Sequence, residues 1–131
     1  MPIERRMTLP ATAKSAGMAR RRLRWLDDLL GVARAQDVRL AISELIANVI
    51  RHGEIGPDQD LVLDVRATPA ILTVRLRQPT QARDGRLPQA APAALPEGGW
   101  GLMIVERLTD RWGIEPGPPG EVWFEIDLKE A

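Results

Sequence analysis

The chain has 131 residues, of which 44 % are apolar and 27 % are charged, and its formal net charge is zero. This length predicts one domain, residues 1–131, and the neutral charge argues against bulk attraction to nucleic acid or to a membrane. Cysteine is absent, which excludes disulfides and thiolate zinc sites. The chain has no apolar run long enough to cross a bilayer and no signal peptide, so a cytoplasmic location is expected.

Two predicted elements open the chain. A short strand is expected at 4–9 and a helix at 14–30, where apolar residues recur at steps of four, three and four. These residues are Ala19, Leu23, Leu26 and Leu30. Gly31 is expected to end this helix, because glycine readily adopts the left-handed conformation found at helix ends.

A basic run, RRRLRW at 20–25, lies on this predicted helix. It has two interpretations, a nucleic-acid patch or a solvated face whose charge is partly offset by Asp27 and Asp28, and the neutral chain favours the second. Charge is uneven along the chain: residues 1–53 carry ten basic and five acidic side chains, and residues 54–131 carry eight and thirteen. The N-terminal half could therefore attract an acidic partner or ligand.

A second helix is expected from Asp37, which can cap its start, to His52, with Gly53 as a left-handed stop. Two strands, 61–65 and 71–77, then form a predicted hairpin. Apolar and polar residues alternate in both strands, which is typical of an antiparallel sheet with one covered face.

Residues 79–98 contain four prolines and have the length of a functional lid. A helix at 100–110, a short strand around Trp112 and a last strand at 121–129 follow. These elements predict an α/β two-layer sandwich, in which a mixed, mostly antiparallel sheet is covered on one face by helices.

The stretch ELIANVIRHG, 44–53, places Glu44, Asn48 and His52 at four-residue steps on the second helix. An amide oxygen is a suitable ligand for Mg²⁺, which otherwise keeps its waters and substrate phosphates. A carboxylate one turn away could deprotonate a hydroxyl that attacks phosphorus. Spacing alone nevertheless favours an ordinary exposed helix face, so this column does not define a site by itself.

A glycine turn, GGWGL at 98–102, precedes the third predicted helix. Glycines allow the backbone to approach a ligand closely, and the start of a helix directs free N–H groups at an anion. The turn lacks the lysine of a P-loop, and it lies outside any strand–helix–strand unit that would support a dinucleotide fingerprint. Glycines before a helix can also simply form a turn.

Taken together, ELIANVIRHG and the later GGWGL resemble the ATP-binding domain shared by histidine kinases, type II topoisomerases and the MutL repair proteins. Within that superfamily, the size and element order look like those of bacterial anti-sigma factors with serine kinase activity. The endings GLMIVERLTDRWG and VWFEID are similar to those of the short, single-domain actinobacterial type. The likeness extends over nearly the whole chain.

This resemblance implies a role for each matching residue. Glu44 would be the general base that activates a serine hydroxyl of an antagonist protein, and Asn48 would bind Mg²⁺ at the phosphates of ATP. Residues 79–98 would be the ATP lid. The other implied nucleotide-binding positions are His52, Gly53, Gln78, Gly99, Gly101 and Leu102. The implied partners are that antagonist and a sigma factor, and the family also implies a homodimer formed through the N-terminal strand and helix.

The chain departs from the family pattern in the first glycine box. Gln78 occupies the position of an aspartate that accepts a hydrogen bond from the adenine amino group, and Thr80 occupies the position of a glycine. Because a charge-assisted hydrogen bond is about twice as strong as a neutral one, adenine binding about tenfold weaker is expected. Two hypotheses therefore remain: a regulatory serine kinase, or a non-catalytic protein-binding module with weak or no nucleotide binding.

Overall fold

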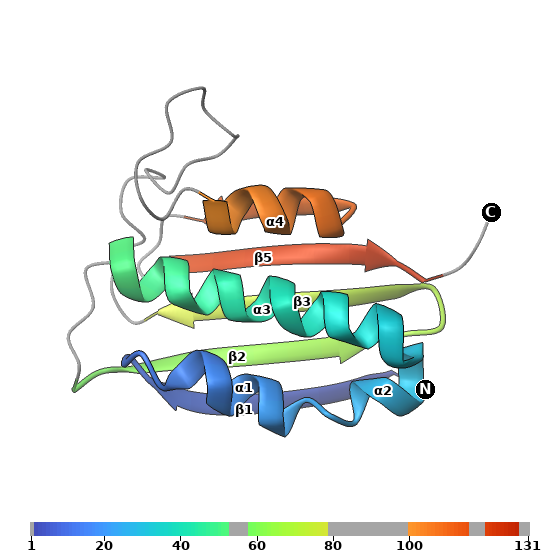
Figure 1. Cartoon of the computed structure of the whole chain (residues 1–131), viewed down its shortest axis with the longest axis horizontal. Helices are drawn as coiled ribbons and strands as arrows, with labels where there is room; N and C mark the ends of the chain where they lie inside the picture. The colour runs from blue at the N-terminus through green and yellow to red at the C-terminus, as the bar shows by residue number, and fades with distance from the viewer. Residues whose placement is uncertain (1, 53–57, 79–99, 116–119, 129–131) are drawn as a thin grey trace.

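The computed structural model describes residues 2–52, 58–78, 100–115 and 120–128. Its helices and strands are shown in Figure 1. In chain order they are β1 (Ile3–Pro10), α1 (Ser15–Arg22), α2 (Leu26–Leu30), α3 (Val32–His52), β2 (Asp60–Ala67), β3 (Ile71–Gln78), α4 (Trp100–Leu108), β4 (Arg111–Glu115) and β5 (Gly120–Asp127).

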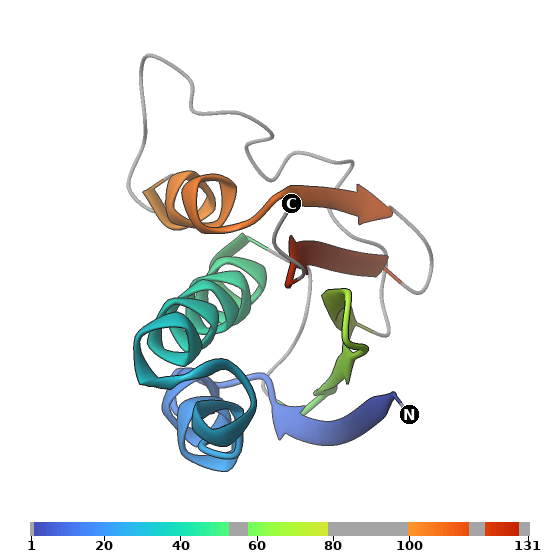
Figure 2. The same cartoon turned by 90° about the vertical axis from the view of Figure 1, so that its right-hand side faces the viewer.

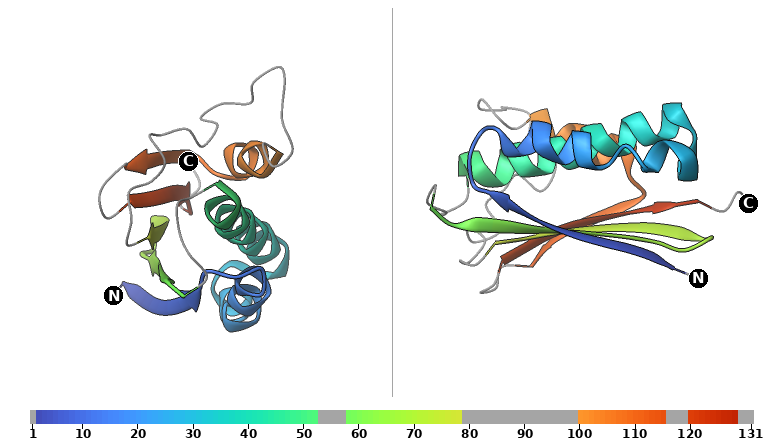
Figure 3. Two further views of the ribbon diagram at one scale, coloured as in Figure 1. Left: turned by 90° about the vertical axis from the view of Figure 1, so that its left-hand side faces the viewer. Right: turned by 90° about the horizontal axis from the view of Figure 1, so that it is seen from below.

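The five strands form one sheet in the order β1-β2-β3-β5-β4, and each neighbouring pair in the described part of the chain is antiparallel. Figures 2 and 3 show the helices in a single layer over one face of this sheet, with α3 between α4 and the α1–α2 pair. The predicted two-layer sandwich with a mostly antiparallel sheet is therefore confirmed.

The core lies between the two layers. Every second residue along β2, β3 and β5 points toward the helices. The apolar face of α3 packs against these residues. The inward-facing residues of these strands are buried; they include Leu61, Leu63, Val65, Leu72, Val74, Leu76, Val122, Phe124 and Ile126. Because α3 lies in the middle of its layer, its two flanks are covered by α1, α2 and α4, all of which contact it.

The predicted helix at 14–30 is wrong in one respect, since it breaks into α1 and α2. Leu23 leaves the helical conformation (φ −103°, ψ 18°), and the amide of Leu26 donates to the Leu23 carbonyl only three residues back, at 3.0 Å. This tighter turn keeps both leucines fully buried. Gly31, with φ 85°, ends α2 as predicted.

Asp37 was wrongly predicted to cap the second helix. α3 begins at Val32, directly after Gly31, and the amide of Ala35 donates to the Gly31 carbonyl at 2.9 Å. Gly31 therefore ends one helix and supplies the first hydrogen-bond acceptor of the next. Asp37 is an exposed residue within α3, because tertiary packing extends the helix beyond the local capping signal.

The uncovered face of the sheet is polar, as the alternating pattern predicted. Ion pairs join neighbouring strands across it, including Arg6 with Asp64 at 2.8 Å and Arg111 with Asp127 at 2.6 Å. The hydrogen bonds from Arg111 lower the pKa of the Asp127 carboxyl below its usual range. These contacts are solvent-screened, so they define the character of this face more than they stabilise it.

On the same face, Trp123 of β5 covers Gly113 of β4. The two residues are directly opposite each other in the register. A Cβ atom at Gly113 would lie 2.7 Å from Cζ2 of the indole and 2.9 Å from Nε1, closer than real contacts allow. Glycine is therefore the residue that lets the ring lie against the neighbouring strand.

We expect Gly113→Ala to lower the free energy of unfolding by about 1–3 kcal/mol, because the indole must move away from the new methyl group. Alanine is otherwise no worse than glycine in a strand, so intrinsic propensity does not explain such a loss. Urea unfolding measures the effect. In a Trp123→Ala background the same substitution should be neutral, and an equal loss in both backgrounds would contradict the proposed contact.

Candidate functional site

The polar column on α3 does not lie on one exposed face. Glu44 is half-buried and Asn48 is only 1 % exposed. The reason is helix geometry: each step of four residues rotates the side chain about 40° beyond a full turn, so the column winds from the edge of the helix toward the core. His52 is the last residue of α3, and its side chain lies outside the described residues. The interpretation as an ordinary exposed helix face is therefore wrong at Asn48.

The buried amide of Asn48 is unusual in its bonding. Neither Oδ1 nor Nδ2 has a hydrogen-bond partner among the residues that the structure describes. A buried polar group without a partner costs about 1–3 kcal/mol, so native proteins rarely retain one without a reason. An amide oxygen held in this way suits a hard cation such as Mg²⁺.

The Asn48 amide could supply only one ligand to a magnesium ion. Within the described ranges, no three His, Asp or Glu side chains lie close enough together to hold a metal ion by themselves. This agrees with the coordination habit of Mg²⁺, which takes one or two protein ligands and completes its shell with water and phosphate oxygens. The Asn48 amide therefore fits a magnesium ion that arrives with a nucleotide.

Gln78 lies on the opposite layer, facing the helices. It is the last residue of β3, it is 4 % exposed, and it continues the inward-pointing series of Leu72, Val74 and Leu76. It is also paired in register with Gly120 at the start of β5. The sequence-predicted adenine position is thus a buried amide on the sheet side of the same interlayer space that holds Asn48.

The start of α4 completes the arrangement. α4 packs against α3 and begins at Trp100, so Gly101 and Leu102 belong to its first turn. Figure 1 shows the C-terminal end of α3, the end of β3 and the start of α4 at the same end of the molecule. The structure therefore brings together the elements that carry the two predicted motifs. Gly53, Gly99 and the predicted lid at 79–98 lie outside the described residues.

The structure also contains an ion pair between α2 and α3 that sequence spacing did not predict. Asp27, expected to offset the basic run beside it, instead pairs with Arg39 of α3 at 2.6 Å. The pairing depends on how α2 packs on α3, so no local sequence signal identifies it.

Comparisons with known proteins identify the family and the fold. Residues 9–123 match the model of the histidine kinase-like ATPase domain family, and the chain belongs to that family. Its fold is similar to that in the crystal structure of the RsbU and RsbW domains of Rv1364c from Mycobacterium tuberculosis. That likeness has a TM-score of 0.59 and 22 % identity, and it covers 97 % of this chain but 32 % of the other.

No curated protein matches the chain. The predicted resemblance to the histidine-kinase-like ATP-binding domain is confirmed by the family match, and the similarity to a structure containing an RsbW domain extends over almost the whole chain. None of the helices in the described part of the chain has the length and apolar character that a membrane crossing requires.

Proposed function

We propose that this chain is an anti-sigma-factor-like regulator that binds Mg-ATP and transfers its terminal phosphate to a serine of an antagonist protein. A sigma factor would be held or released according to the state of that antagonist. The observation that carries the proposal is the Asn48 amide, which is buried near the C-terminal end of α3 and has no hydrogen-bond partner among the described residues. Family membership supports a nucleotide as its ligand.

In this proposal the residues divide the chemistry between them. The Asn48 Oδ1 atom would hold Mg²⁺, and the ion would supply positive charge to neutralise the phosphates. The Glu44 carboxylate accepts the proton of the serine hydroxyl. The serine oxygen then forms a bond to the γ-phosphorus of ATP, and the bond between that phosphorus and the oxygen of the departing ADP breaks. Backbone and side-chain contacts to the nucleotide come from His52, Gly53, Gln78, Gly99, Gly101 and Leu102. We take residues 1–131 as one ATP-binding unit and assign 79–98 as its lid.

A second candidate function rests on Gln78. This buried amide occupies the position where the family has an adenine-binding aspartate. A chain that has lost this contact could keep the fold and its protein surfaces while binding nucleotide weakly, and would then regulate through protein contact alone. The same protein partners, and a homodimer formed through β1 and α1, apply to both candidates.

Calorimetry with Mg-ATP separates the two candidates. A kinase should bind with a measurable enthalpy that disappears when EDTA removes the magnesium, because Asn48 acts through the ion. A binding module should give no heat even at millimolar nucleotide. Binding that is equally tight with and without magnesium would contradict the role proposed for Asn48 in either case.

We expect Gln78→Asp to tighten Mg-ATP binding about tenfold, because the carboxylate restores a charge-assisted hydrogen bond to the adenine amino group. Gln78→Asn is the matched control, since it shortens the side chain equally but adds no charge. GTP is the second control, because guanine carries a carbonyl where adenine carries its amino group. Equal affinities of the two variants for ATP would show that Gln78 does not contact the base.

A further inference from the structure

Four polar side chains are buried within the described part of the chain, and two of them are carboxamides. The hydroxyls of Ser15 and Ser43 donate to backbone carbonyls nearby in the chain. The amides of Asn48 and Gln78 come from opposite layers, since α3 carries the first and β3 the second. The C-terminal end of α3 and the end of β3 lie at the same end of the molecule (Figure 1). Each layer therefore contributes one buried amide to the candidate site.

The inner face of the sheet beside Gln78 suits a flat, mostly apolar ring. Gln78 follows Leu76 in the inward series of β3, and its partner in register on β5 is Gly120, which Val122 follows inward. Residues paired in register on antiparallel strands place their side chains on the same face of the sheet. The Gln78 amide therefore stands at the end of an apolar sheet face, next to a position to which β5 contributes no side chain.

A carboxamide differs from a carboxylate because it carries a hydrogen-bond donor as well as an acceptor. Its carbonyl oxygen accepts, its amino group donates, and half a turn about the last side-chain bond exchanges their places. Adenine carries the amino donor N6 at the place on the ring where guanine carries the carbonyl acceptor O6. An amide at this point can therefore bind either purine, whereas an ionised carboxylate can only accept from adenine.

We propose that the Gln78 amide contacts N6 of adenine or O6 of guanine, so that the site accepts Mg-GTP about as well as Mg-ATP. This inference rests on the proposed function, because it takes the nucleotide site as given, and it names the substrate class as purine nucleoside triphosphates. Asn48 would anchor the phosphates of both nucleotides through magnesium in the same way. The base of each would then meet the amide at the same place, and rotation of the amide would match it.

Calorimetry on the unaltered chain with the magnesium complexes of ATP, GTP, ITP and CTP gives the first test. ITP carries the O6 carbonyl but lacks the second amino group of guanine, so it isolates the contact to the amide. We expect the three purine nucleotides to bind within about threefold of one another, because one amide serves both kinds of base. CTP should bind at least about tenfold more weakly, because its single ring is too small to reach the amide.

The outcomes of this titration separate the inference from the proposed function. Binding of ATP with both GTP and ITP at least about tenfold weaker would overturn the inference and leave the proposed function standing. Equal affinity for CTP would show that the phosphates alone are bound, which would also overturn the inference. No binding of any of the four nucleotides would overturn both.

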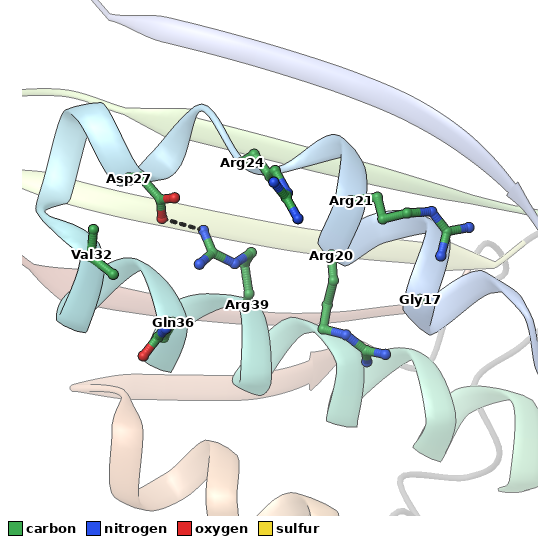
Figure 4. A pocket seen from close by; sticks show the side chains of 8 residues that line it. All are labelled: Gly17, Arg20, Arg21, Arg24, Asp27, Val32, Gln36 and Arg39. Carbon is green, nitrogen blue, oxygen red and sulfur yellow. Dashed lines mark hydrogen bonds and ion pairs between the residues drawn. The ribbon is translucent and has the colours of Figure 1, made fainter.

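Gln78→Glu keeps the length of the side chain but removes its donor. This variant should bind Mg-ATP at least as tightly as the unaltered chain and should bind GTP and ITP at least about tenfold more weakly, because its carboxylate has no proton to share with O6. Gln36→Glu is the matched control, since it makes the same change at an exposed residue of α3 (Figure 4), about 18 Å along the helix from Asn48. Equal loss of GTP affinity in both variants would overturn the inference.

Gln78→Met keeps the test valid if a buried glutamate prevents folding. Methionine is unbranched and of similar length, so it preserves the apolar inner face of the sheet, and circular dichroism checks the fold. It removes donor and acceptor together and should weaken ATP, GTP and ITP by a similar factor of about three to ten. If the ratio of the ATP and GTP affinities changes instead, another group distinguishes the two bases and the assignment to Gln78 is wrong.

Discussion

Asn48→Leu should make the chain more stable in the absence of nucleotide and insensitive to Mg-ATP. Asn48 is 1 % exposed and its amide atoms lack partners within the described residues. Leucine has a similar volume and removes both unsatisfied atoms, so we expect the free energy of unfolding to rise by about 1–3 kcal/mol. The unaltered chain should instead gain about 2.7 kcal/mol from ligand at a hundredfold excess over Kd, and the variant should not.

Urea unfolding with and without Mg-ATP measures both effects in one series. Ser43→Ala is the matched control on the same helix, because Ser43 is also buried but its hydroxyl donates to the Arg39 carbonyl at 2.8 Å. That variant should keep its response to Mg-ATP. A destabilised Asn48→Leu chain would show that the amide has a structural role, and a retained nucleotide response would remove Asn48 from the site.

The two buried polar residues of α3 differ in their hydrogen bonding. The Ser43 hydroxyl donates to backbone carbonyls of Arg39 and Leu40 in its own helix, so its hydrogen-bonding capacity is satisfied within α3. Asn48 has a longer side chain and two polar groups, and α3 offers neither of them a partner. Under the proposed function this amide is held for a ligand, which is the pattern expected where a site is pre-organised at the expense of stability.

Much of the fold follows from local sequence pattern. The alternation of Leu61, Leu63 and Val65 identifies the covered face of β2, because a strand places every second side chain on one side. Gly31 identifies a helix end, because few other residues adopt its φ of 85° without strain. Such signals depend on a single residue or on a short repeating pattern, so they can be recognised without knowing how the rest of the chain folds.

Features that depend on how helices and strands pack against one another could not be predicted from local sequence patterns. The break after Arg22 and the start of α3 at Val32 are decided by how the helices cover the sheet, not by capping residues. The same holds for Asn48, whose spacing from Glu44 was visible but whose burial depends on the layers around α3. The pairing of Asp27 with Arg39 is likewise a product of tertiary structure.

Glu44→Gln should separate nucleotide binding from phosphoryl transfer. Glu44 lies one helical turn before Asn48 and is half-buried, so it can approach a bound nucleotide without being the residue that holds its magnesium. Glutamine keeps the shape of the side chain but cannot accept the serine proton. We therefore expect the affinity for Mg-ATP to stay within about threefold, while transfer to an antagonist serine falls about 10²- to 10⁴-fold.

Transfer of label from radioactive ATP to the antagonist measures the rate, and calorimetry measures the affinity. Glu106→Gln is the matched control, because Glu106 is an exposed carboxylate on α4 whose loss changes the net charge equally. If Glu44→Gln and Glu106→Gln transfer phosphate at the same rate, Glu44 is not the base. If Glu44→Gln instead loses nucleotide binding, its carboxylate belongs to the magnesium shell beside Asn48, and the proton acceptor must be sought elsewhere on the chain.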